Sequence, residues 1–281
     1  SGRTDAETER KENPLDFALW KAAKEGEVSW DSPWGPGRPG WHIECSVMAT
    51  EILGDTIDIH GGGADLEFPH HTNEIAQSEA KTGKTFANYW MHNGFVNVDN
   101  EKMSKSLGNF VTVHDMLQTV DGQVLRFFLA TQQYRKPINF TEKAIHDAEV
   151  NLKYLKNTHS LPLTEQVNQA ELQTYLDAFQ EAMDDDFNTA NGVTVLFDMA
   201  KWINSGNYDQ TVKDAFEKML QVFGIVFEEE VLDEDIEKLI EERQAARANK
   251  DFATADRIRD ELAAQGIKLL DTKEGVRWTR D

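Results

Sequence analysis

Apolar positions along the first hundred residues follow a helical period, then a strand period, and then repeat this order. Residues 40–53 space their apolar side chains as one helical face, and residues 56–60 read as a short strand that runs into three glycines. Pro69 suits the first position of a second helix, which we expect to end near Thr82. The aromatic-rich stretch 89–98 is typical of a second strand. Helix, strand, helix, strand in this order predicts an α/β fold of the doubly wound type.

The rest of the chain predicts mainly helices. The stretches with a 3.6-residue apolar period are 122–132, 142–156, 169–184, 188–203 and 212–222. We expect these stretches to form a helical bundle, followed by an acidic linker at 228–235. Beyond the linker we expect two more helices, 236–247 and 252–264, and then a β-hairpin with strands at 267–270 and 276–278.

The composition favours a soluble, folded protein. The 281 residues are 40% hydrophobic and include 7 Trp and 15 Phe, which is enough to build real cores. No apolar run approaches the roughly 18 residues that span a bilayer, and the polar first residues lack the apolar stretch of a signal peptide. We therefore expect a cytoplasmic protein without membrane contact.

The net charge of −21 argues against a surface built for nucleic acid, because phosphate binding needs basic side chains. The charge is unevenly distributed, since residues 241–281 contain nine basic and nine acidic side chains. An acidic protein with a neutral tail could still bind RNA through a local patch there.

Residues 102–106, Lys-Met-Ser-Lys-Ser, form a candidate phosphate-binding loop. Lys102 and Lys105 lie three positions apart, with serines beside them and Gly108 close behind. A flexible cationic loop of this kind could place ammonium charge where negative charge develops on a polyphosphate. By residue type alone, however, two lysines on a solvated surface loop are the better interpretation.

Cys45, the single cysteine, is one member of a candidate metal site. A lone cysteine is usually a small buried hydrophobic residue and excludes an internal disulfide. Farther along the chain, His70 and His71 both share a helical face with Glu74. Thiolate, imidazole and carboxylate are competent zinc ligands, but zinc usually takes four positions and this set offers three. Spacing does not choose between the histidines, and by spacing alone two surface histidines beside a glutamate are the better interpretation.

Residues 58–65 contain a histidine followed by three glycines, directly after the first predicted strand. Glycines there let the backbone approach a ligand closely. A lipase oxyanion loop has a similar string, but no G-x-S-x-G occurs in the chain. Residues 83–85 resemble the end of a P-loop, but Ser78 stands where that pattern requires glycine.

Together these motifs resemble the cysteinyl-tRNA synthetases, a class I aminoacyl-tRNA synthetase family, along essentially the whole chain. Lys-Met-Ser-Lys-Ser is the signature of that class, and a match at five specified positions is rarely accidental. The other matching strings are residues 40–46, 58–65, 68–74, 184–189 and 250–278.

The resemblance implies that Cys45, His70 and Glu74 bind one Zn²⁺, and it prefers His70 over His71. Pocket shape alone discriminates cysteine from serine weakly. A zinc ion binds a thiolate far better than a hydroxyl, so it would select the cysteine substrate without an editing domain.

The implied activity is that of a cysteine–tRNA ligase, which uses ATP with Mg²⁺, cysteine and tRNA(Cys). The cysteine carboxylate attacks the α-phosphate of ATP, and a ribose hydroxyl of the tRNA then attacks the cysteinyl-adenylate. Lys105, assisted by Lys102, would stabilise charge on the departing phosphates. Trp41 and His60 would line the amino-acid pocket, although Trp41 could equally be a core aromatic. The residues implied to lie against the adenosine are Gly61, Gly62, Gly63 and Asp65.

The tail is implied to read the anticodon. The positions that match anticodon contacts in the family are Arg247, Phe252, Asp256 and Asp271. Phe252 would stack on an unpaired base, although packing inside a helical hairpin explains a phenylalanine there equally well.

The resemblance also implies the fold class, a Rossmann-like α/β half-domain of a class I synthetase followed by an α-helical bundle and a small α+β C-terminal domain. The expected regions are the half-domain with the zinc ligands (1–90), the stem-contact region with the phosphate loop (91–148), the tRNA-binding bundle (149–228) and the anticodon-binding domain (229–281). The family's H-I-G-H motif and its additional zinc cysteine have no counterpart here. We therefore expect this chain alone to lack half of the nucleotide site and to be inactive in adenylate formation. We also expect a monomer.

Two other interpretations stay open. A related ligase joins cysteine to an amino-sugar and shares the zinc and the phosphate loop, but it lacks an anticodon-reading tail, so the tail match disfavours it. The second is a non-catalytic RNA-binding or zinc-binding module that kept the same scaffold.

Overall fold

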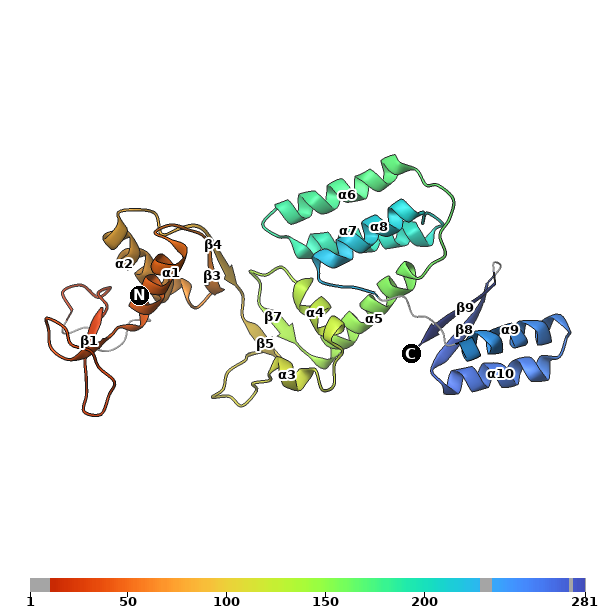
Figure 1. Ribbon diagram of the computed structural model, residues 1–281, viewed down its shortest axis with the longest axis horizontal. Helices are drawn as coiled ribbons and strands as arrows, with labels where there is room; N and C mark the ends of the chain where they lie inside the picture. Colours follow the sequence, from red (N-terminus) through yellow and green to blue (C-terminus); the bar gives the residue numbers. More distant parts are fainter. Residues whose placement is uncertain (1–10, 228–233, 273–274, 281) are drawn as a thin grey trace. The chain divides into compact units, whose positions relative to one another are not determined.

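The computed structural model describes residues 11–227, 234–272 and 275–280. Most of the linker predicted at 228–235 therefore lies outside the described residues. The chain divides into two compact units, Ser1–Val226 and Phe227–Asp281, and each is described by itself (Figure 1).

The first unit begins with a small α/β layer. Its elements are β1 (Trp20–Ala22), β2 (Gly37–Pro39), α1 (Trp41–Leu53), β3 (Ile57–Gly63), α2 (Thr72–Thr82) and β4 (Ala87–Asn93). Strands β3 and β4 are parallel neighbours, whereas β1 and β2 form a separate antiparallel ribbon. Helix α1 packs against α2, and buried Ile57 and Phe86 form the centre of a small core beneath them. This is the helix–strand–helix–strand order that the periodicity predicts.

Helix α2 itself begins at Thr72, and Pro69 lies in the π-helical turn that runs directly into it, after the non-helical Phe68. The Phe68–Pro69 peptide is cis and Phe68 is extended (φ −137°, ψ 132°), so residues Glu67–His71 form a wide turn before α2. The predicted end at Thr82 is confirmed. Gly83 follows in the left-handed conformation (φ 68°) that commonly closes a helix.

The predicted strand 89–98 is in fact parts of two strands in different sheets. A three-stranded sheet takes the second part, with strands β5 (Val96–Val98), β6 (Glu101–Lys102) and β7 (Ile138–Phe140). Gly94 separates the two strands, and a Cβ there would lie 2.4 Å from the backbone of Lys136. Asp99 and Asn100 form the β5–β6 turn with φ values of 48° and 68°, which Asp and Asn tolerate better than other side chains.

Helices make up most of the remaining first unit. They are α3 (Val113–Met116), α4 (Gly122–Ala130), α5 (Glu142–His159), α6 (Gln169–Asp184), α7 (Thr189–Asn204) and α8 (Gln210–Val222). Side chains cap the first turns of the five longer ones, from Asp121, Thr141, Asn168, Asn188 and Asp209. Leu155, Leu196 and Phe216 are completely buried among them. The five predicted helices are confirmed, with ends that differ by a few residues at most.

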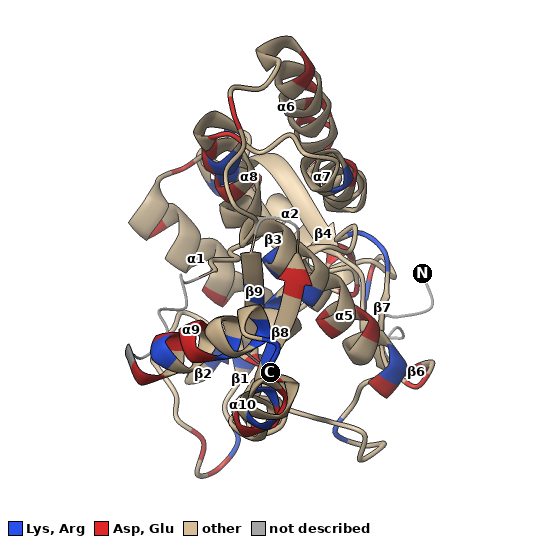
Figure 2. Cartoon of the chain, turned by 90° about the vertical axis from the view of Figure 1, so that its right-hand side faces the viewer, with Lys and Arg blue, Asp and Glu red and all other residues tan. Residues whose placement is uncertain are grey.

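The second unit pairs a helical hairpin with a two-stranded ribbon. Its elements are α9 (Glu234–Ala248), α10 (Phe252–Ala264), β8 (Ile267–Thr272) and β9 (Gly275–Arg280). The two strands are antiparallel, and buried Ile236, Ile258, Leu262 and Ile267 form a core shared by α9, α10 and β8. Figure 2 shows basic and acidic segments interspersed along α9 and α10. The predicted helices and hairpin are confirmed.

Candidate functional site

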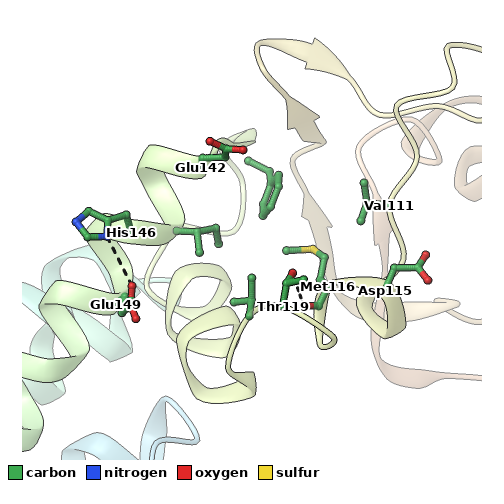
Figure 3. A pocket seen from close by; sticks show the side chains of 10 residues that line it. Val111, Asp115, Met116, Thr119, Glu142, His146 and Glu149 are labelled. Carbon is green, nitrogen blue, oxygen red and sulfur yellow. Dashed lines mark hydrogen bonds and ion pairs between the residues drawn. The ribbon is translucent and has the colours of Figure 1, made fainter. Parts of the chain in front are cut away.

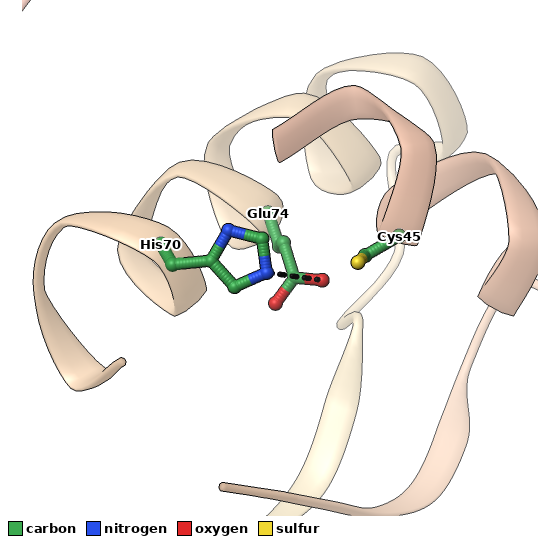
Figure 4. A group of neighbouring side chains, drawn as sticks. All are labelled: Cys45, His70 and Glu74. Carbon is green, nitrogen blue, oxygen red and sulfur yellow. Dashed lines mark ion pairs between the residues drawn. The ribbon is translucent and has the colours of Figure 1, made fainter. Parts of the chain in front are cut away.

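Cys45, His70 and Glu74 lie together in the first unit (Figure 4). Cys45 belongs to the first half of α1, His70 to the wide turn, and Glu74 to the first turn of α2. Their sulfur, ring-nitrogen and carboxylate atoms all lie within 4.8 Å of one another. The packing of α1 against α2 therefore brings together the three residues that the sequence marks as candidate ligands.

Glu74 is the buried centre of this group. Its side chain has no exposed surface, and its Oε1 has no hydrogen-bond partner among the described residues. Oε1 lies 3.7 Å from His70 Nε2, too far for a hydrogen bond, whereas Oε2 accepts one from His60 Nε2 at 2.8 Å. A carboxylate oxygen buried without a donor is costly. Because a thiol and an imidazole lie beside it, the residues present fit a bound zinc ion.

Five of the chain's eight histidines gather around Glu74. His42 Nδ1 lies 2.7 Å from His70 Nδ1, and His71 Nδ1 lies 2.8 Å from His92 Nε2. His71, His60 and Glu74 form a second group whose ligand atoms lie within 4.8 Å of one another. The geometry thus groups His70 with Cys45, and His71 with His60, a choice that spacing could not make.

Burial favours the uncharged forms of three groups in this cluster. It lowers the pKa of His42, and with the neighbouring His60 it lowers the pKa of His71 to about 4. Burial also raises the pKa of the Cys45 thiol, and the charge of Glu74 adds to this. Both histidine rings are therefore neutral at pH 7. A bound cation would act on the thiol in the opposite direction, because coordination removes its proton.

Trp41 lies on the rim of the site. It is 59% exposed and stacks on the His70 ring, with centroids 4.6 Å apart. The interpretation of Trp41 as a core aromatic is therefore wrong. That Trp41 and His60 contact the amino acid stays a prediction.

The glycines after the first strand have a packing reason of their own. They belong to β3, and a Cβ on Gly62 would lie 3.0 Å from both the His71 ring and the Leu66 side chain. Any larger residue at position 62 would therefore press against His71 and Leu66 and displace them by a few tenths of an ångström. Contact of the nucleotide with Gly61, Gly62, Gly63 and Asp65 stays a prediction.

The candidate phosphate loop follows β6 and is held by Asn109. The side-chain oxygen of Asn109 accepts a hydrogen bond from the Ser104 amide at 2.9 Å, and its side-chain nitrogen donates one to the Lys102 carbonyl at 3.3 Å. Lys102 Nζ lies 4.0 Å from the ring centroid of Phe95. Among the described residues, neither Lys102 nor Lys105 forms an ion pair with a carboxylate, and both are exposed. Both ammonium groups are thus free to meet an anion.

A separate hollow of about 400 Å³ lies beside α3 and α5 (Figure 3). Its lining includes Asp115, Glu142 and Glu149, and His146 Nδ1 lies 3.6 Å from the Glu149 carboxylate. Carboxylates repel phosphate, and none of the predicted site residues lines this hollow. It is therefore not the predicted nucleotide site.

The predicted anticodon residues lie in the second unit. Phe252 begins α10 and is 63% exposed, so its interpretation as a core residue is wrong. Asp256 forms an ion pair within α10. Asp271, on β8, is bound by Arg247 and by the buried Arg243, which the sequence analysis missed. Whether these residues contact an anticodon stays a prediction.

Three family models match consecutive parts of the chain. The model described as the tRNA synthetases class I (C) catalytic domain matches residues 1–150, which is more than half of the chain. The chain belongs to this family. The DALR domain model matches residues 178–228, and the cysteinyl-tRNA ligase anticodon binding domain model matches residues 229–278. The predicted fold class is thereby confirmed, and the tail match disfavours the amino-sugar ligase.

Curated relatives of the chain carry the name cysteine–tRNA ligase. One from Streptococcus thermophilus is 96% identical over all 281 residues, and one from Streptococcus pyogenes serotype M6 is 86% identical over the same length. The chain spans 63% of the length of each. The resemblance to the cysteinyl-tRNA synthetases is confirmed.

More distant likenesses occur among solved structures. The LeuRS of Agrobacterium radiobacter K84, in a ternary complex with tRNA and LeuAMS, has a TM-score of 0.47 at 12% identity, over 74% of this chain and 34% of its own. The Mycobacterium tuberculosis methionyl-tRNA synthetase with methionyl-adenylate has a TM-score of 0.42 at 18% identity, over 59% of this chain and 39% of the synthetase chain. No residue assignment follows from likenesses this distant. Within the described part of the chain, no helix combines the length and the apolar character of a membrane span.

Proposed function

We propose that this chain is the part of a cysteine–tRNA ligase that selects the cysteine thiol, carries the phosphate-binding loop and reads the anticodon. The observation that carries the proposal is the group of half-buried Cys45 with buried His70 and Glu74, in which a carboxylate oxygen without a donor lies beside a thiol and an imidazole. The names of the near-identical relatives support the same activity for the whole protein.

The residues of the site have different roles in the selection of the substrate. Cys45, His70 and Glu74 would hold a zinc ion, which when bound supplies a soft Lewis acid that prefers the cysteine thiolate to a serine hydroxyl. The hydrogen bond from His60 fixes one oxygen of Glu74 and leaves the other free to ligate. Trp41, exposed on the rim, offers an apolar wall to the substrate.

The phosphate loop would serve the transfer of the adenylyl group. The cysteine carboxylate attacks the α-phosphate of Mg²⁺-bound ATP, the bond to the β-phosphate oxygen breaks, and pyrophosphate leaves. Lys105 and Lys102 place ammonium charge near the departing phosphates, where charge contacts of this kind are worth most. A ribose hydroxyl of tRNA(Cys) then displaces AMP from cysteinyl-adenylate. We further propose a cytoplasmic monomer, and the single cysteine fits a reducing compartment.

We propose four regions along the chain, with two boundaries moved from their predicted places. The predicted boundaries at 90/91 and 148/149 fall inside β4 and α5, and a continuous strand or helix is not divided between domains. Boundaries at Gly94 and Thr141, where those elements end and begin, avoid this. The boundary at 228/229 needs no change, because it lies beside the division between the compact units.

Paired histidine variants test the function. In the purified chain, His70→Ala should abolish bound zinc, measured as metal per chain, while His146→Ala, an exposed histidine of the acidic hollow, should keep it. In the full-length Streptococcus thermophilus relative, the substitution corresponding to His70→Ala should also abolish cysteine-dependent pyrophosphate exchange. Unchanged zinc and unchanged exchange in that variant would sink the proposal.

A further inference from the structure

Arg243 is a buried guanidinium that the proposed reaction does not use. It is 6% exposed, and its Nε has no hydrogen-bond partner among the described residues. Its Nη1 and Nη2 donate to the two carboxylate oxygens of Asp271 at 2.9 and 3.0 Å. Burying a charged arginine is expensive, and an ion pair offsets that cost only in part. The core of the second unit is apolar, so fold stability alone does not account for Arg243.

The carboxylate that Arg243 holds is shared with an exposed partner. Arg247 lies one turn farther along α9 and donates to Oδ2 of the same Asp271. The side chains of Asp271 and Arg247 are 43% and 45% exposed, whereas that of Arg243 is 8% exposed. A carboxylate accepts about four hydrogen bonds, and the two arginines occupy three of these. One acceptor position on the half-exposed Asp271 and the other N–H groups of the half-exposed Arg247 therefore stay available.

We propose that Arg243 is a positioning residue, which fixes Asp271 and Arg247 as a donor–acceptor edge that reads an unpaired nucleobase of the tRNA. This inference rests on the proposed function of the tail. Unpaired bases are recognised through hydrogen bonds on their Watson–Crick edges and through stacking on aromatic rings. The exposed ring of Phe252 at the start of α10 offers such a stacking surface.

The bidentate geometry explains why an arginine stands at position 243. A guanidinium that binds both carboxylate oxygens fixes the plane of the carboxylate, whereas a lysine holds only a point charge beside it. Since a base edge is read by hydrogen bonds of fixed direction, the plane of Asp271 decides whether the edge fits. A merely structural clamp between α9 and β8 would instead affect every RNA equally.

Binding of two RNA hairpins by the full 281-residue chain tests this. One hairpin is the anticodon stem–loop of tRNA(Cys), and the other is the same hairpin with three uridines as its anticodon. Arg243→Met should reduce the preference for the first hairpin by about tenfold or more, the scale of one hydrogen bond to a charged group, and should change binding of the second hairpin little. The matched control is Arg257→Met, which removes an equal charge at a side chain that is 65% exposed on α10 and paired with Glu261. This variant should leave the preference between the two hairpins unchanged.

Two further variants separate positioning from folding. In an Asp271→Asn background, Arg243→Met should cause no further loss of preference, because the arginine acts through that carboxylate. If Arg243→Met unfolds the second unit in a thermal melt, Arg243→Lys serves in its place, because it keeps the charge without the bidentate guanidinium. This variant should fold and should lose the preference for the first hairpin to the same extent.

Three results overturn the inference, and they are distinguishable from failure of the proposed function. Full preference in folded Arg243→Met, equal weakening of both hairpins, or unfolding of both position-243 variants would make Arg243 a structural residue only. If the unsubstituted chain shows no preference between the hairpins, the anticodon-reading function itself fails, and this inference fails with it.

Discussion

Glutamine in place of Glu74 should have opposite effects on stability with and without zinc. In the metal-free protein the Glu74 carboxylate is fully buried and only one of its oxygens is hydrogen-bonded. A buried charge costs several kcal/mol to desolvate, whereas an unpaired amide costs about 1–3 kcal/mol. The metal-free Glu74→Gln chain should therefore be as stable as the unsubstituted chain, or more stable by up to about 2 kcal/mol.

With zinc present the balance should reverse. A ligand at a hundredfold excess over its dissociation constant stabilises the folded state by about 2.7 kcal/mol. For a unit of 150–250 residues this corresponds to a rise in melting temperature of about 5–10 °C. An amide is not among the usual zinc ligands, so Glu74→Gln should lose this rise entirely.

Thermal unfolding after chelation, and again after zinc is restored, measures both effects. The matched control is Glu44→Gln, the same substitution at the exposed neighbour of Cys45 on α1, which should keep the full zinc-dependent rise. A zinc-dependent rise in Glu74→Gln equal to that of the control would refute the ligand assignment. A large loss of stability in the metal-free variant would show that Glu74 serves as a structural hydrogen-bond acceptor for His60 instead.

Three other outcomes follow from single groups. Lys105→Ala, placed in the full-length Streptococcus thermophilus relative, should cut cysteine-dependent pyrophosphate exchange by about 2–4 kcal/mol of barrier at unchanged melting temperature, and exchange at the unsubstituted rate would make Lys105 a surface residue only. Tyr208→Phe should lower the free energy of unfolding by about 1–2 kcal/mol, because the buried hydroxyl donates to the His159 carbonyl at 2.8 Å; a denaturant titration measures this, and no change would contradict it. Hydrogen bonds from Arg243 hold the pKa of Asp271 below its ordinary value of 3.8, so the unfolded state takes up the proton first and stability falls as pH drops below about 4. Hydrogen exchange of β8 should follow this acid loss, and Asp271→Asn should flatten it; an unaltered acid profile in that variant would count against the ion pair.

Helices could be predicted from the sequence because their signals are local. The five helices between residues 122 and 222 carry a 3.6-residue apolar period, and this period already marks the face that is buried in the folded protein. Their capping side chains directly precede them in the chain. The short strands β6 and β7 could not be predicted in this way. Each has three residues or fewer, and pairing with β5 defines them. The division of 89–98 at Gly94 likewise depends on the backbone of Lys136, which is distant in sequence.

The candidate metal group illustrates what motif and packing each contribute. Cys45, His70 and Glu74 could be named from the family resemblance, because their strings are specific. His42 and His92 could not, because their contacts with His70 and His71 arise where α1, the wide turn and β4 meet. No spacing in the chain marks these two residues. Their rings pack against those of His70 and His71, which flank Glu74.

The charge of the chain is a poor guide to the proposed RNA binding for a related reason. Within the second unit, most of the described arginines form ion pairs with neighbouring carboxylates, as Arg257 does with Glu261 and Arg259 with Asp256. Arg243 adds a buried charge that no outside phosphate can reach. A surface of this kind neutralises few phosphates, so little affinity is available from counterion release. If the tail reads an anticodon as proposed, binding energy must then come from contacts with the bases themselves. Under that condition the position of one carboxylate, that of Asp271, would decide whether an RNA is recognised.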